Sequence, residues 1–317
     1  ILDAPIVIDP IPGGTSMAFN LPATHTITGT AESNAFGNTQ VITADYAISG
    51  GEDNENAGQS SIVIGANITN EAEEAAVFGS SHTIDPVATG SLVGGSQNAV
   101  EAPLGFAVGQ QNLVQGDSSA AFGESCEVSG RTSIVAGDTS NVSGDSSFAI
   151  GENVMVTSDG SIGAGQGHTV GGVYSIAVGE NNLIDASSGL SIAVGQDIQI
   201  DSSHNAAFGD GVIIGAGTEN IAAGKSHNIT DSLNAVFGDS QTVSATRSLV
   251  SGNTNTVSGG SSITGGDGAD TITGGAAADI IVTGAGIDSC SGSLTIRWLY
   301  LQYRCIRWLR PLFPRYR

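Results

Sequence analysis

The feature that most constrains this chain is a glycine that returns about every fourteen residues. It closes a motif of small and apolar residues, as in SIVIG ending at Gly65, SAAFG ending at Gly123 and SIAVG ending at Gly179. The glycines are Gly37, Gly50, Gly65, Gly79, Gly95, Gly109, Gly123, Gly137, Gly151, Gly165, Gly179, Gly195, Gly209, Gly224, Gly238, Gly252 and Gly265. Ten of the sixteen intervals equal 14, and the others are 13, 15 or 16. Such a period predicts a solenoid of stacked coils.

Fourteen residues suit two short strands and two tight turns, so the sequence predicts an all-β fold, a parallel β-roll or β-solenoid. Side chains alternate between the two faces of a strand. We place the residues three and one before each glycine, such as Ile62 and Ile64, inside the coil. The Ile or Val five residues after the glycine, such as Ile84 and Val100, is the predicted inward residue of the second strand. The glycine itself turns the corner, where a positive φ costs it little.

With that alternation, the residue two before each glycine lies on the outer face. This column is Val63, Val77, Val93, Ala107, Ala121, Val135, Ala149, Gly163, Ala177, Ala193, Ala207, Ala222, Val236 and Val250. A long apolar strip is rarely left exposed on a soluble monomer. The column is therefore the predicted interface of a homo-oligomer, with an exposed smooth strip as the alternative.

The charge of the chain is strongly acidic and unevenly placed. The net charge is −22, and residues 1–292 hold all 31 acidic residues against Arg131, Lys225 and Arg247. Such a surface repels nucleic acid and anionic membranes and favours divalent cations or cationic partners, although solubility alone also explains it. The three cysteines, Cys126, Cys290 and Cys305, form no disulfide or metal framework. No apolar run is long enough for a transmembrane helix.

Several columns of polar residues recur, but their regularity argues against chemistry. Three residues after the glycine the chain carries His25, His82, His168, His227, Asn98, Asn112, Asn182, Gln241 and Asn255. A column that accepts His, Asn and Gln predicts a hydrogen-bonding ladder and not a zinc site. Serines four before the glycine fit turn chemistry, and acids such as Glu124 and Glu152 after it form a solvated stripe. No catalytic arrangement interrupts the repeat, so we expect no enzyme.

The repeats resemble a known family. SFAIGENVMV (147–156), SIAVGENNLI (175–184) and SIAVGQDIQI (191–200) are similar to the SVAIG-type repeats of YadA-like trimeric autotransporter adhesin heads. The resemblance covers roughly residues 31–265. It implies a left-handed, trimeric β-roll that attaches to a surface glycan or matrix protein, outside the cell or at a bacterial cell surface. The coiled-coil stalk and membrane anchor of that family have no counterpart here.

A second motif follows. GGDGADTIT (265–273) resembles the RTX calcium-binding nonapeptide, and GGAAADIIV (274–282) and TGAGIDSCS (283–291) are degraded copies. Carboxylates and exposed carbonyls are the oxygen ligands that Ca²⁺ prefers. Candidate metal ligands are Asp267, Asp270, Asp279 and Asp288. The alternative is a series of plain Gly and Asp turns that end the solenoid.

These observations divide the chain into four segments. Residues 1–30 form a linker and cap, 31–264 the head-repeat β-roll, 265–292 the RTX-like repeats, and 293–317 a basic, aromatic tail that resembles a frame-shifted or artefactual end. The predicted function is that of an adhesin head acting through multivalent contact. A structural filament or phage-fibre shaft, a solenoid that binds ice or another flat surface, and a β-solenoid polysaccharide enzyme are the alternatives.

Overall fold

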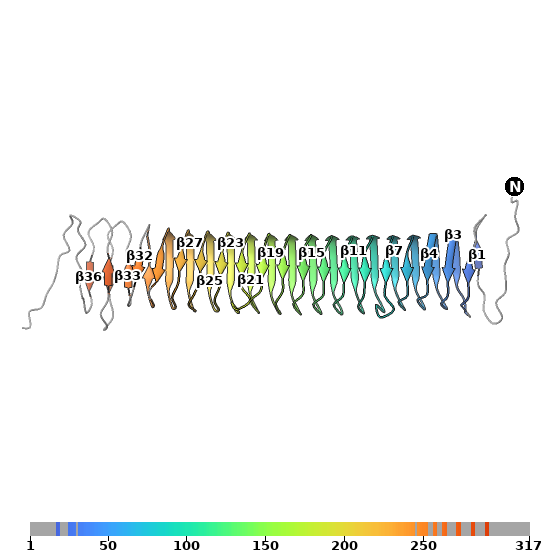
Figure 1. Ribbon diagram of the computed structural model, residues 1–317, viewed down its shortest axis with the longest axis horizontal. Helices are drawn as coiled ribbons and strands as arrows, with labels where there is room; N and C mark the ends of the chain where they lie inside the picture. The colour runs from blue at the N-terminus through green and yellow to red at the C-terminus, as the bar shows by residue number, and fades with distance from the viewer. Residues whose placement is uncertain are drawn as a thin grey trace, which may run out of the picture. The chain divides into compact units, whose positions relative to one another are not determined.

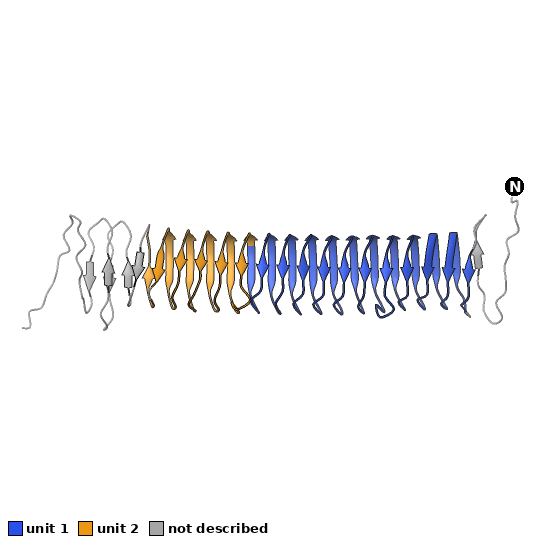
Figure 2. Ribbon diagram, in the orientation of Figure 1, with its two compact units in different colours: residues 1–178 blue, residues 179–317 orange. Residues whose placement is uncertain are grey.

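A computed structural model shows an all-β, parallel β-solenoid of about 16 turns with coils of about 14 residues, and no helix among the residues that it describes. These are residues 17–19, 25–29, 31–244, 246–252, 256–258, 262–264, 271–273, 280–282 and 289–291. The chain divides into two compact units, residues 1–178 and 179–317 (Figure 2). The predicted fold class is confirmed. The handedness and trimeric state stay predictions.

Each regular coil contributes one strand of five residues and one of two residues, and Figure 1 shows the long and short strands alternating along each unit. In unit 1 the strands near the N-terminus are β1 (Met17–Phe19), β2 (Thr26–Ile27), β3 (Asn34–Ile42) and β4 (Ile48–Asn56). The long strands that follow are β5 (Ile62–Ala66), β7 (Ala76–Ser80), β9 (Leu92–Ser96), β11 (Phe106–Gln110), β13 (Ala120–Glu124), β15 (Ile134–Asp138), β17 (Phe148–Glu152) and β19 (Ile162–Gln166). Their short partners are β6 (Thr69–Asn70), β8 (Thr83–Ile84), β10 (Ala99–Val100), β12 (Leu113–Val114), β14 (Glu127–Val128), β16 (Asn141–Val142), β18 (Met155–Val156) and β20 (Thr169–Val170).

Unit 2 repeats the arrangement after β21 (Ile176–Glu180), in which the unit boundary falls. Its long strands are β23 (Ile192–Gln196), β25 (Ala206–Asp210), β27 (Ile221–Lys225) and β29 (Ala235–Asp239), followed by the two-residue β31 (Leu249–Val250). The strands between them are β22 (Leu183–Ile184), β24 (Gln199–Ile200), β26 (Ile213–Ile214), β28 (Asn228–Ile229) and β30 (Thr242–Ser244). The chain then forms β32 (Thr256–Ser258), β33 (Ser262–Thr264), β34 (Thr271–Thr273), β35 (Ile280–Val282) and β36 (Ser289–Ser291).

Strands of neighbouring coils pair in parallel, long on long and short on short. Gly109 pairs with Gly123 in the long strands, and Leu113 pairs with Glu127 in the short ones. One member of the predicted glycine series is wrong. Gly51, and not Gly50, pairs with Gly37 and with Gly65, so these two steps are also 14 residues.

The face assignment of the long strand is wrong, and the predicted interface lies inside the coil. Every described member of that column is buried: Val63, Val77, Val93, Ala107, Ala121, Val135, Ala149, Ala177, Ala193, Ala207, Ala222, Val236 and Val250. The column faces the short strand across a narrow interior. At Gly163, which has no side chain, a Cβ would meet a methyl of Val154 at 2.6 Å and one of Val156 at 3.1 Å. The residues are small because the two strands are close, and not because another chain approaches.

The second strand was assigned correctly. The Ile or Val five residues after the glycine is fully buried in each coil where its burial is described, as at Ile84, Val100 and Ile200. Val257 was also predicted to point inward, and its side chain lies outside the described part. Inward residues from both strands therefore fill the coil, and the burial of apolar surface by stacked neighbours stabilises the solenoid.

The corners are built differently from the prediction. The coil glycine lies within the long strand with a positive φ, +125° at Gly123, and an added Cβ there would come within 1.9 Å of the carbonyl oxygen of Gly137. The turn falls two residues later, where Ser125 has a φ of 54°. A second left-handed residue, Ser118, has a φ of 58° seven residues earlier. Each corner N–H still bonds to the preceding coil, since Ser125 donates to the Gln110 carbonyl at 2.9 Å.

The step between paired strands lengthens toward the C-terminus. Leu249 pairs with Ile263, fourteen residues on, whereas Ile263 pairs with Ile281 and Ile272 pairs with Cys290, eighteen residues on. A step of eighteen residues equals two nonapeptides. The strands at 262–291 are therefore spaced as expected for a roll that uses two nine-residue repeats per turn.

Candidate functional site

The outward side of the long strands is unusually apolar. In unit 1 we define the apolar face as the residues three and one before each glycine on strands β4 to β19. They are Ile48, Gly50, Ile62, Ile64, Ala76, Phe78, Leu92, Gly94, Phe106, Val108, Ala120, Phe122, Ile134, Ala136, Phe148, Ile150, Ile162 and Ala164. None is charged, and most of the larger ones are exposed, as at Phe78 and Ile150, each 42% accessible. Ile48, Phe106 and Phe148 are partly buried. The residues of this face were predicted to lie inside the coil.

The opposite, short-strand side of unit 1 is mixed in character. Its outward positions include Thr83, Glu127 and Asn141 beside the exposed Met155. A carboxylate such as Glu101 follows the short strand and accepts a hydrogen bond from the amide of Gln115 at 2.8 Å. The apolar face is therefore uncharged, whereas the short-strand side carries charged residues.

The predicted hydrogen-bonding ladder is confirmed inside the coil. The backbone N–H of Asn98 donates to Nδ1 of His82 at 3.1 Å, so the ring proton is on Nε2, which donates to the carbonyl of Phe78 at 3.1 Å. The N–H of Asn112 donates in turn to Oδ1 of Asn98 at 2.9 Å. Each ring or amide thus links two successive coils. Burial lowers the pKa of His82 below its usual value.

The ladder also satisfies the glycine carbonyls. The amide of Asn112 donates to the carbonyl of Gly123 at 3.0 Å, and that of Gln241 to Gly252 at 2.7 Å. In the same column Cys126 directs its thiol to the Gly137 carbonyl at 3.4 Å, and burial raises the pKa of this thiol. A buried carbonyl without a partner is costly, so polar residues recur here for structural reasons. His168 and His227 likewise bond to the carbonyls of Ala164 and Ala223.

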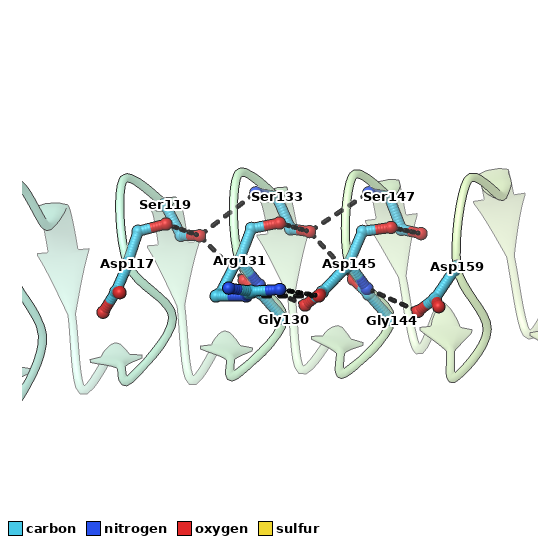
Figure 3. A network of polar contacts seen from close by, with 9 residues as sticks. All are labelled: Asp117, Ser119, Gly130, Arg131, Ser133, Gly144, Asp145, Ser147 and Asp159. Atoms are coloured by element: carbon cyan, nitrogen blue, oxygen red, sulfur yellow. Dashed lines mark hydrogen bonds and ion pairs between the residues drawn. The ribbon is translucent and has the colours of Figure 1, made fainter.

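The serines four before the glycine form a second ladder, drawn in Figure 3. The hydroxyl of Ser119 donates to the carbonyl of Gly130 at 2.8 Å and accepts the N–H of Ser133 at 3.1 Å. Ser133 repeats both contacts with Gly144 and Ser147. Ser119, Ser133 and Ser147 are buried, and each donates its hydroxyl to a backbone carbonyl.

One corner of unit 1 carries a network of charged groups (Figure 3). The guanidinium of Arg131 lies 3.0 Å from the carboxylate of Asp145, whose other oxygen accepts the Arg131 backbone N–H at 2.8 Å. Asp159 accepts the N–H of Asp145 in the same way at 2.9 Å. The backbone and side-chain hydrogen bonds from Arg131 lower the pKa of Asp145. Since both partners are exposed, the pair contributes little to stability.

The described residues contain no group of three or more His, Cys, Asp or Glu side chains arranged to hold a metal ion. The four candidate calcium ligands, Asp267, Asp270, Asp279 and Asp288, lie outside the described residues, between strands β33 and β36. Asn255 of the polar column lies outside them as well. The acids of the predicted stripe, such as Glu124, Asp138 and Glu152, are exposed at the ends of their strands.

Residues 255–290 match the family described as RTX calcium-binding nonapeptide repeats, in four copies. These repeats are calcium-binding, so the match supports Ca²⁺ as the ligand of this segment. No curated protein matches the chain. The described residues contain no helix of the length and hydropathy that crossing a membrane requires. The fold and the match fit an extracellular, repetitive β-solenoid protein with RTX repeats at residues 255–290.

Proposed function

We propose that this chain is the head of a non-enzymatic adhesin that works outside the cell or at a bacterial surface. The observation that carries the proposal is the repetition of the same outward positions on coil after coil of each unit. A ligand contact made by one coil is then available many times. Repeated weak contacts raise avidity without any single strong site. The resemblance of the repeats to YadA-like heads supports the same conclusion.

The solenoid is suited to present such contacts rigidly. Backbone hydrogen bonds link the coils within each unit at strands and at corners, and the His, Asn and Ser columns add side-chain bonds from coil to coil. Immobile contact groups lose little conformational freedom when a ligand binds. The fitting ligands are extended and repetitive themselves, such as a surface glycan or a matrix protein.

Self-association is part of the proposal, and a trimer is the state that the resemblance favours. The predicted column cannot serve as the interface, because it is buried within the single chain. The apolar face is the surface that remains for it. In this proposal residues 31–264 form the head and residues 265–292 bind calcium, which aids folding after secretion, when the ion becomes abundant.

A structural filament or fibre shaft is the second candidate. It is favoured by the uniformity of the described coils, whose long strands repeat the same small and apolar residue types. Such a shaft would hold two ends apart and bind nothing along its length.

Binding of the full chain to arrays of glycans and matrix proteins separates the two functions. The adhesin is expected to bind a defined set of ligands, more tightly as an oligomer than as a monomer. Light scattering with and without EDTA reports the oligomeric state of the same sample. An oligomer that binds no ligand on either array overturns the adhesin and favours the shaft.

A further inference from the structure

The corner that carries Ser118 changes character along unit 1. Its left-handed residue lies five before the coil glycine, and over six successive coils this residue is Leu104, Ser118, Thr132, Ser146, Gly160 and Tyr174. The residue before it is Pro103, Asp117, Arg131, Asp145, Asp159 and Val173. Four coils with small and charged corner residues therefore lie between two apolar pairs. We define this part of the corner, residues of the two columns from Pro103 to Tyr174, as the corner trough.

The middle of the corner trough is an open hollow. It has a volume of about 350 Å³ and is lined by Asp117, Ser118, Arg131, Thr132, Asp145 and Ser146. Figure 3 shows the charged members following one another from coil to coil. The hydroxyls of Ser118, Thr132 and Ser146 make no hydrogen bond within the described part of the chain. A hollow of this volume, with free polar groups on its wall, is large enough for a small organic ligand.

The carboxylate of Asp117 is also without a hydrogen-bond partner among the described residues. Asp145 and Asp159 each accept the backbone N–H of the residue fourteen before, which is Arg131 and Asp145 respectively. The residue fourteen before Asp117 is Pro103, which has no N–H to donate. The Arg131 guanidinium bonds to Asp145 through Nε and Nη2, which leaves Nη1 for a ligand. The hollow thus offers both donors and acceptors.

The two ends of the corner trough carry the most exposed large apolar side chains among the described residues. Tyr174 is 65% and Leu104 is 61% accessible. Side chains so exposed add little to the stability of their own coil, and the φ of 54° at both positions is unfavourable for a residue with a Cβ. The Tyr174 ring lies over Gly160, where an added Cβ would come within 2.5 Å of its Cδ1. An exposed aromatic ring therefore closes this end.

The free groups of the corner trough favour a glycan over a peptide. An extended peptide binds through main-chain hydrogen bonds along a free edge. The corner N–H groups are already used, since those of Ser118, Thr132 and Ser146 donate to the carbonyls of Pro103, Asp117 and Arg131. Three carboxylates against one guanidinium give the four coils a charge of −2, which opposes nucleic acid and acidic polysaccharides. A ligand rich in hydroxyls and free of acidic groups remains.

We infer that the corner trough binds a linear, β-linked glycan without acidic groups, laid along the coils of unit 1. Successive coils are about 4.8 Å apart, a step close to the length of one β-linked pyranose ring. Hydroxyls of successive rings bond to Asp117, Arg131 and the corner hydroxyls, and the ring above Gly160 stacks its C–H groups on the face of Tyr174. Five steps from Leu104 to Tyr174 give about 24 Å, the length of about five rings.

This inference rests on the proposed function, and it names the site and the class of glycan. The rest of the adhesin proposal relies on contacts that repeat along every coil. The corner trough is different because it is bounded at both ends. Its binding should therefore depend on particular residues and on the length of the ligand.

Substitution of the ring tests the site. Cellohexaose, chitohexaose, fully deacetylated chitohexaose and β-mannohexaose are titrated into the full chain, and calorimetry should show binding of at least one. Tyr174→Ala should weaken that binding about tenfold and Tyr174→Phe should keep it, since the ring provides the stacking. Tyr46→Ala is the matched control, because Tyr46 is a corner tyrosine with a φ of 56° that is 58% accessible and lies outside the trough. Equal losses for Tyr46→Ala and Tyr174→Ala overturn the inference.

A second variant and a series of ligand lengths test the bounds. Asp117→Ala should weaken binding several-fold and leave thermal unfolding unchanged, because its carboxylate has no hydrogen-bond partner in the described part of the chain. Affinity should rise from the disaccharide to about the pentasaccharide and then level, since further rings extend beyond Leu104 and Tyr174. Affinity that keeps rising to the decasaccharide spreads the contacts over many coils and overturns the trough.

The outcomes also separate this site from the adhesin. A heparin hexasaccharide is the acidic comparison and should not bind. A chain that binds a matrix protein but none of the four hexasaccharides, or that binds only the heparin fragment, removes this inference and leaves the adhesin. A chain that binds a hexasaccharide in the trough, with no gain in affinity as an oligomer, keeps the site and removes multivalent attachment.

Discussion

Nδ1 of His82 accepts a hydrogen bond from the backbone N–H of Asn98, 3.1 Å away and one coil further along the chain. The ring is almost fully buried, and its other nitrogen donates to the Phe78 carbonyl. A protonated ring would set an N–H against the Asn98 N–H. The neutral ring is therefore built into the contact between two coils.

We expect acid to weaken this contact. Burial lowers the pKa of His82 below its usual value of 6.5, so the unfolded chain binds more protons than the folded one as the pH falls below 6.5. The stability that the neutral His82 ring contributes is complete above pH 6.5 and is lost as the pH falls below that value. Thermal unfolding at pH 7.5 and pH 5 should show a smaller acid loss for His82→Asn, because Asn98 and Asn112 occupy the same column. His204→Asn, at an exposed corner, should behave as the parent does.

Because alternate residues of the long strand point inward and outward, two neighbouring alanines should differ in how much stability an Asp substitution costs. Ala121 is fully buried and Ala120 is partly exposed on the apolar face. Ala121→Asp places a carboxylate in the coil interior and should cost several kcal/mol of stability. Ala120→Asp should cost much less in chemical denaturation of the dilute chain. Equal losses for the two variants would contradict the assignment.

A second adjacent pair tests the positive φ of the coil glycines. A Cβ at Gly95, where φ is +109°, would come within 2.0 Å of the Gly109 carbonyl oxygen, whereas one at Gly94 meets only a Val108 methyl at 3.9 Å. Gly95→Ala should therefore destabilise the neighbouring coils, and Gly94→Ala should be nearly neutral. Hydrogen exchange at strands β9 and β11 measures the difference coil by coil. Similar protection in both variants would argue against the strain.

Calcium is expected to stabilise the segment that matches RTX repeats. Titration of the EDTA-treated full chain with Ca²⁺ should raise its thermal stability, since a ligand bound only by the folded state stabilises it. Combined replacement of Asp267, Asp270, Asp279 and Asp288 by Asn should abolish the response. Asp145→Asn, at the Arg131 corner, is the control that should keep it. A response that survives the fourfold replacement places calcium elsewhere.

Part of the candidate site could be predicted from residues that repeat. The column of His82, Asn98 and Asn112 indicated a hydrogen-bonding ladder, because His and Asn side chains can both accept and donate hydrogen bonds. The partners of the ladder could not be predicted. Asn112 donates to the carbonyl of Gly123 in the next coil, a contact that only the path of the backbone in three dimensions shows.

The sequence by itself determined the coil length, through the spacing of Gly109, Gly123 and Gly137, and the inward column of the short strand, where apolar residues alternate with polar ones. The face of the long strand was decided only by the tertiary structure. Both the buried and the exposed columns of this strand are apolar. The alternation of side chains therefore did not show which column points into the coil. The short strand lies across a narrow interior and leaves room only for residues such as Ala121. Larger neighbours such as Phe122 are therefore turned outward.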